Sequence, residues 1–100
     1  MYYYEVPENV INNFRKGLKL YKEGFSGNGL VEKTIDEAHS IVLHRRVTEE
    51  KLKRMRAWFA RHDKAGYKRI VNPPSPGYVA FLLWGGSEGR AFANRVLKDE

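Results

Sequence analysis

A run of apolar residues from Tyr78 to Trp84 constrains the fold more than any other part of the sequence. Nearly every side chain in this run, Tyr-Val-Ala-Phe-Leu-Leu-Trp, favours burial. Periodicity alone does not separate a buried helix from a buried strand in so short a run. The flanks favour a helix, because Ser75 and Pro76 form an N-terminal capping pattern and Gly85 suits a left-handed residue that ends a helix. We therefore predict a short, buried central helix over residues 76–84.

This central helix is expected to be the scaffold on which the other helices pack, with Trp84 as an anchor in the core. Replacing a fully buried Trp84 by alanine would cost roughly 3 to 5 kcal/mol of stability. A much smaller cost would mean that the run is exposed and forms a binding surface.

Four other segments have apolar residues at helical spacing, and they are residues 7–24, 30–44, 49–64 and 88–98. No internal repeat or low-complexity tract accompanies them. We therefore predict an all-α fold, a single compact domain of four to five short helices around the buried central helix. The domain spans residues 1–100. Residues 1–6 are expected to form an extended arm that either packs on the core or stays flexible.

Single residues predict where these helices end and where they touch. Gly17 lies inside the first helix, where glycine costs up to about 1 kcal/mol relative to alanine, so it marks a close contact between helices. Thr48 and Ser87 are expected to cap the third and the last helix. Gly85 and Gly86 allow a sharp reversal of the chain, although the same segment could instead present backbone amides to an anion.

The composition excludes several classes of protein. The sequence contains no cysteine, which excludes thiol redox chemistry and thiolate metal sites and argues against a disulfide-stabilised secreted scaffold. Its longest apolar run is far shorter than the roughly 20 residues of a membrane-spanning helix, and its first residues lack the features of a signal peptide. We therefore expect a soluble, intracellular protein with no membrane partner.

The net charge of +6 is distributed unevenly. Residues 1–50 contain seven Lys and Arg against eight acids, and residues 51–100 contain eleven against four, which gives −1 and +7. Such asymmetry indicates an anionic partner, and nucleic acid is favoured over a membrane because no helix joins a basic face to an exposed apolar one. The alternative is a surface that is basic without binding anything.

The third predicted helix combines an apolar stripe, which includes His62 and has Trp58 at its edge, with a cationic opposite side. Cations spaced along an exposed helix suit the phosphates of a nucleic acid. The predicted binding residues are Lys53, Arg54, Arg61 and Lys64 on that side, with Arg45, Arg46, Lys68 and Arg69 at its two ends. No helix-turn-helix spacing is present, so base-specific recognition has no support.

Histidine patterns do not indicate a metal site or an enzyme. His39 and His44 are five residues apart, whereas two metal ligands on one helix face are four apart. His62 continues an apolar stripe, which favours a structural hydrogen bond over catalysis. The segment from Ser26 to Gly29 lacks the Lys-Ser or Lys-Thr of a phosphate-binding loop. We predict no catalytic residue, no metal and no cofactor.

A recognisable pattern is formed by residues 54–64, Arg-Met-Arg-Ala-Trp-Phe-Ala-Arg-His-Asp-Lys, by residues 74–86 with the run described above, and by residues 89–91, Gly-Arg-Ala. Residues 15–18, Arg-Lys-Gly-Leu, and the glycines near position 27 extend the pattern into the first half. Over most of its length, and most specifically in its second half, the chain resembles small uncharacterised proteins encoded in bacteriophage and prophage genomes. The chain departs from the pattern at Phe81, where tryptophan is usual, and at Ser87 and Glu88, where an Asp-Ala pair tends to occur. The resemblance implies a viral or virus-derived origin and implies no activity.

Three functional hypotheses follow, and the first two are not enzymatic. The first is a small helical module that binds the backbone of DNA or RNA without sequence specificity, through the cationic side of the third helix. The alternative is a phage structural or assembly module whose basic face meets an acidic phage or host protein and whose residues 2–4 or Trp58 contribute to an oligomer. A catalytic His62 is the third and least supported hypothesis. The expected location is the cytoplasm of a host cell or the virion, and the sequence leaves the oligomeric state open.

Overall fold

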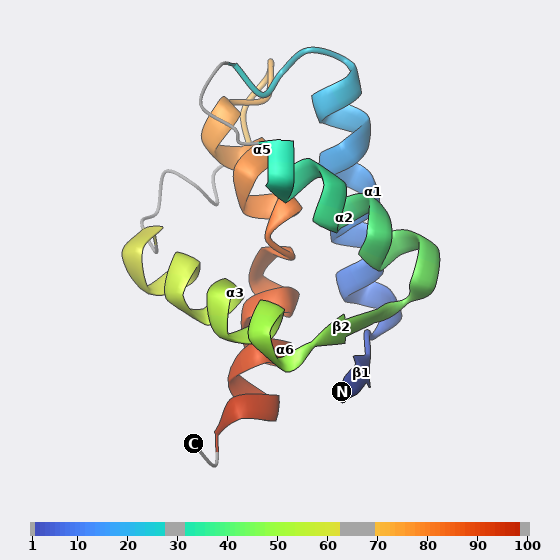
Figure 1. Ribbon diagram of the computed structural model, residues 1–100. Helices are drawn as coiled ribbons and strands as arrows, with labels where there is room; N and C mark the ends of the chain where they lie inside the picture. The colour runs from blue at the N-terminus through green and yellow to red at the C-terminus, as the bar shows by residue number, and fades with distance from the viewer. Residues whose placement is uncertain (1, 28–31, 63–69, 99–100) are drawn as a thin grey trace.

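The apolar run forms helix α5 (Pro76–Leu83), as the sequence predicted. The computed structural model describes residues 2–27, 32–62 and 70–98 (Figure 1). The Ser75 side chain accepts a hydrogen bond from the backbone N–H of Tyr78 at 3.1 Å, so the predicted N-cap is confirmed. The buried residues of α5 are Tyr78, Val79, Phe81, Leu82 and Leu83.

Trp84, the residue after α5, is only partly buried. Its indole packs against the buried side chains of both hydrophobic clusters of the core. The cost of replacing it by alanine should therefore fall below the range for a fully buried tryptophan.

The junction between α5 and α6 (Gly86–Leu97) depends on two consecutive glycines in left-handed conformations. Gly85 has φ of 109° and Gly86 has φ of 67°, which turn the chain so sharply that α6 begins at once. Gly85 is the N-cap residue and Ser87 lies exposed in the first turn, so the prediction that Ser87 caps this helix was wrong. Asn13 fixes the junction, because its side-chain N–H donates to the carbonyl oxygen of Gly85 at 2.8 Å.

Helix α1 (Glu8–Lys22) lies against α5 along the face that contains Gly17. A Cβ atom added at Gly17 would lie 2.9 Å from Cγ and 3.0 Å from the backbone nitrogen of Leu83. The close helix contact that the sequence predicted at Gly17 is therefore confirmed. Tyr21 belongs to the apolar spacing of this helix, yet it is exposed.

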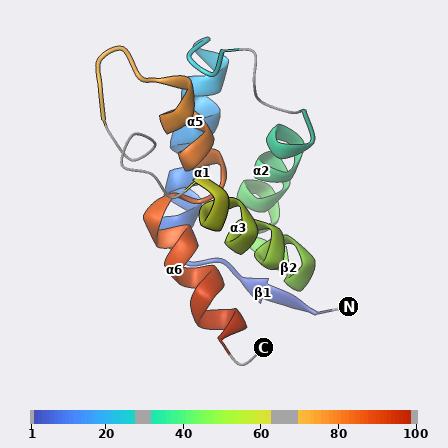
Figure 2. The same cartoon turned by 90° about the vertical axis from the view of Figure 1, so that its left-hand side faces the viewer.

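The remaining helices pair with different partners. Helix α2 (Glu32–His44) packs on α1, and α3 (Glu49–His62) packs on α6. Figure 2 shows α3 in front, with α2 on one side of it and α6 on the other. The side-chain oxygen of Thr48 accepts a hydrogen bond from the backbone N–H of Lys51 at 3.1 Å, which confirms the predicted cap of α3.

A short antiparallel ribbon joins the N-terminal arm to the segment between α2 and α3. Strand β1 (Tyr3–Glu5) pairs with strand β2 (Arg46–Thr48), with Tyr4 opposite Val47. Of the two alternatives for the arm, the structure therefore has it packed on the domain. Helix α2 ends before β2 because Arg45 adopts a left-handed conformation with φ of 59°.

The protein is thus a compact all-α domain, as the sequence predicted, with one small ribbon that the sequence did not predict. One hydrophobic cluster lies between α1, α2, α3, α5 and α6, and a second joins Trp58 and Phe59 of α3 to Tyr78, Phe81 and Leu82 of α5. None of the helices in the described ranges combines the length and the apolar composition needed to span a membrane.

Replacing Gly17 by alanine is expected to destabilise the protein although alanine favours helix formation. The added methyl group overlaps Leu83 and its backbone, and such overpacking costs about 1 to 3 kcal/mol, more than the helix propensity of up to about 1 kcal/mol that alanine contributes. Urea unfolding measures the difference. Lys19→Ala, at an exposed position of the same helix, is the control. An equal or greater stability for Gly17→Ala would contradict the close contact.

Candidate nucleic-acid interface and the charge cluster beside it

Helix α3 presents three exposed cations to solvent, and they are Lys53, Arg56 and Arg61. The sequence predicted Lys53 and Arg61 and missed Arg56. At 100° per residue, Lys53 lies between the other two around the helix, so the three side chains span its outer face. Lys53 is 3.9 Å from the carboxylate of Glu49 in the first turn, which makes the C-terminal half of α3 the more basic half.

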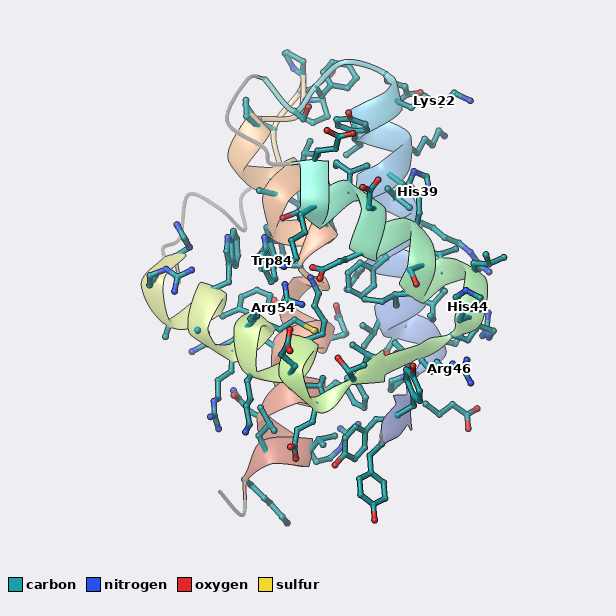
Figure 3. All side chains as sticks on the ribbon, viewed as in Figure 1. Lys22, His39, His44, Arg46, Arg54 and Trp84 are labelled. Atoms are coloured by element: carbon teal, nitrogen blue, oxygen red, sulfur yellow. The ribbon has the colours of Figure 1, made fainter. Side chains whose placement is uncertain are left out.

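Arg54 does not belong to this outer face, which corrects the position predicted from helical spacing. Its side chain points from α3 toward α2, where it forms two hydrogen bonds with the carboxylate of Glu37 (Figure 3). The distances are 2.9 Å from Nη1 to Oε1 and 2.6 Å from Nη2 to Oε2. The reason is its place at the edge of the buried stripe of α3, beside Lys51 and Trp58.

Lys51 is buried, which the sequence analysis did not anticipate. Its side chain is 5% exposed, and its Nζ donates to Oε1 of Glu37 at 2.9 Å and lies 3.9 Å from the centre of the Trp84 ring. The sequence does contain a signal of this burial. Position 51 precedes the buried Met55 by four residues and the buried Trp58 by seven, which places it on the same helix face. We call Glu37, Lys51 and Arg54 the charge cluster.

The charge cluster changes the ionisation of its members. Burial raises the pKa of Glu37, but the hydrogen bonds from Arg54 and Lys51 outweigh it and lower that pKa to about 2. Burial lowers the pKa of Lys51, and its hydrogen bond with Glu37 opposes that effect. Helix α2 packs on α1, whereas α3 packs on α6. The ion pairs of the charge cluster connect α2 directly to α3.

Three aromatic rings stack in a column beneath the cluster. Trp84 lies parallel to Trp58 with ring centres 5.7 Å apart, and Trp58 stacks on His62 at 4.6 Å. The Nδ1 atom of His62 is 3.0 Å from the carbonyl oxygen of Trp58. Through this stacking and this contact, His62 has a structural role. Trp58 is 8% exposed, so it does not offer the oligomer contact considered for it.

The predicted cations at the end of α2 have partners within the protein. Arg45 pairs with Glu8, which also lies 3.4 Å from Arg15. The hydrogen bond from Arg45 lowers the pKa of Glu8. Arg46 is exposed, and its guanidinium lies over the ring of Tyr3 at 4.4 Å. The other predicted binding residues, Lys64, Lys68 and Arg69, lie outside the described residues.

A second basic surface, which the sequence analysis missed, lies on α1. Its exposed cations are Arg15, Lys16, Lys19 and Lys22. Lys16 donates to the hydroxyl of Tyr78 at 3.1 Å. Figure 3 shows Lys22 at the end of α1 that is remote from α3, so the two basic surfaces are separate. The sequence does contain a signal for this surface, because Arg15, Lys19 and Lys22 follow one another at spacings of four and three and so lie on one helix face.

The other candidate sites have structural roles or lack the geometry for chemistry. The side chain of Asn13 also donates to Glu88 at 2.7 Å, and this hydrogen bond lowers the pKa of Glu88. The carboxylate of Glu88 thus lies in the first turn of α6, where an anion would have to bind. His39 and His44 are both exposed on α2. Within the described ranges, no three His, Asp or Glu side chains are arranged to hold a metal ion.

Comparisons of this chain with protein-family models, with curated proteins and with solved structures found no match.

Replacing Glu37 by glutamine tests the ionic bridge between α2 and α3. Glutamine keeps the size of the side chain but leaves the buried Lys51 without its counter-charge. We expect the free energy of unfolding to fall by roughly 2 to 4 kcal/mol, less than for a fully buried pair because Glu37 and Arg54 are partly exposed. Urea unfolding near neutral pH measures the loss. Glu32→Gln, at an exposed position of α2, should change stability by less than about 0.5 kcal/mol.

The same variant should also flatten the dependence of stability on pH. The pKa of Glu37 is about 2 in the folded protein against an ordinary value of 4.5. Its contribution is therefore complete above about pH 4.5 and is lost as the pH falls toward about 2. The unmodified protein should lose more stability on acidification through this range than Glu37→Gln does. Equal losses of stability in the two proteins would contradict the lowered pKa of Glu37.

Proposed function

We propose that this protein binds nucleic acid without sequence specificity through the outer face of α3. The observation that supports the proposal is the group of three exposed cations, Lys53, Arg56 and Arg61, on one side of a helix whose other side is buried. A rigid helix holds such cations at fixed positions, which suits a polymer of regularly spaced phosphates.

The dimensions of α3 fit this role. Lys53 and Arg61 are eight residues apart, which is about 12 Å along a helix. A stretch of duplex of that length carries about seven phosphate charges, so every cation of the outer face can lie near one. Contacts of this kind position a protein on the nucleic acid and do not read its bases.

The sequence predicted that Arg54 binds nucleic acid, but in this proposal Arg54 positions α3. Its guanidinium is bound to Glu37, so it supports the position of α3 and does not contact phosphate. A charge reversal at Arg54 would therefore destabilise the fold and could not test binding.

The proposal predicts that charge reversal on α3 weakens binding to duplex DNA. The variant is Arg56→Glu with Arg61→Glu, and both positions are exposed. We expect the affinity at low salt to fall and the slope of log K against log salt to become shallower by about two, because two phosphate contacts are lost. Fluorescence anisotropy with a labelled duplex, measured over a series of salt concentrations, gives both quantities.

The matched control is Lys19→Glu with Lys22→Glu, which changes the net charge by the same amount in the last turn of α1. This control should keep the salt slope of the unmodified protein. If both variants reduce the slope equally, binding depends on net charge and α3 is not the interface. If only the α1 variant reduces it, the interface is the second basic surface. Absence of binding at low salt would reject the proposal altogether.

A further inference from the structure

We propose that the cavity between α2, β2 and α3 is a binding site for a phosphate group. The cavity has a volume of about 220 Å³. That is below the roughly 300 to 1,000 Å³ of sites for drug-sized ligands, and it suits a small anion. The site lies apart from the outer face of α3, so the inference does not depend on the proposed function.

The residues that line the cavity carry a net positive charge. Arg46, Lys51 and Arg54 are among them, and Glu37 is the one carboxylate among the described residues of the lining. Glu37 already accepts a hydrogen bond from Lys51 and two from Arg54, so its charge is compensated in place. The charge that remains for a ligand is therefore cationic.

Arg46 is the cation best placed to meet a ligand. Its guanidinium carbon lies 4.4 Å from the centre of the Tyr3 ring, a distance at which the ring attracts the cation. This contact with the ring is not a hydrogen bond of the N–H groups, and the planar fork of those groups matches two phosphate oxygens. Tyr3 thus holds Arg46 at the wall of the cavity without consuming its donors.

A further donor belongs to a residue of the same wall. The Thr48 oxygen accepts a hydrogen bond from the backbone N–H of Lys51, which leaves its own O–H as a donor.

The nearby acids fix the side from which an anion can approach. Glu50 lies 3.5 Å from Arg54, and Glu49 lies 3.9 Å from Lys53. Both acids line an adjoining hollow near Tyr2 and are not part of the wall of the cavity. The favourable approach is therefore past Arg46, on the side away from the first turn of α3.

The test is a titration of the full chain with inorganic phosphate, followed by amide chemical shifts at constant ionic strength set with sodium chloride. We expect saturable shifts at Ser40, Thr48 and Lys51. Arg46→Gln should weaken the affinity at least about tenfold, because a charge-assisted bidentate contact is lost. Ser40→Glu, which adds a carboxylate at an exposed position of the cavity wall, should abolish binding.

The control is Arg95→Gln, which removes an exposed arginine on α6 and should leave the phosphate affinity unchanged. Chemical shifts of each variant also report whether the fold is intact, so a loss of affinity can be separated from unfolding. The proposal is rejected if phosphate causes no saturable shift in the millimolar range. It is also rejected if Arg46→Gln and Arg95→Gln weaken binding equally.

Competition with oligonucleotides distinguishes the sources of the phosphate group. Displacement of inorganic phosphate only by a 5′-phosphorylated strand would identify a terminal phosphate monoester as the ligand. Displacement by phosphorylated and unphosphorylated strands alike would identify backbone phosphates. Displacement by neither, with phosphate itself bound, would identify free phosphate or a small phosphate ester. Each result supports a phosphate site, and the variants of the α3 outer face test nucleic-acid binding separately.

Discussion

Burial of α5 is the constraint on which the rest of the structure depends. A helix of this length is not stable by itself in water, so its stability must come from packing on other elements. Gly17 lets α1 approach Leu83 closely, while Trp58 and Phe59 of α3 cover another side. The left-handed Gly85 then allows α6 to begin at once and to pack beneath α3. The chain thus covers its most apolar segment with a close glycine contact on one side and with aromatic rings on another.

The charge cluster shows that the net charge of a sequence is not the charge of its surface. Lys51 and Arg54 belong to the most basic part of the chain, yet both are committed to Glu37. Such a bridge is weak evidence for stability, because desolvation opposes the attraction, but it disfavours arrangements that leave Lys51 unpaired. We infer that the cluster fixes the orientation of α2 relative to α3. Among the cations of α3, Lys53, Arg56 and Arg61 are the ones on its outer face.

The sequence predicted the fold well where the signal was local. The cap at Ser75, the contact at Gly17 and the end of α5 at Gly85 each follow from the chemistry of one residue, and the structure confirms them. The ribbon was missed because three residues are too few for a strand pattern. The charge cluster was missed for another reason. Glu37 and Lys51 belong to different helices, and helical spacing alone does not reveal which side chains meet across a gap between helices.

The central claim, that α5 is the scaffold of the fold, is tested most directly by native-state hydrogen exchange. Amides of a central element exchange only through global unfolding, whereas those of peripheral elements exchange through local opening. If α5 is the scaffold, its slowest amides exchange with a free energy equal to that of global unfolding and respond to urea with the same slope. Exchange of α5 through a smaller opening, while α1 and α3 stay protected, would contradict it.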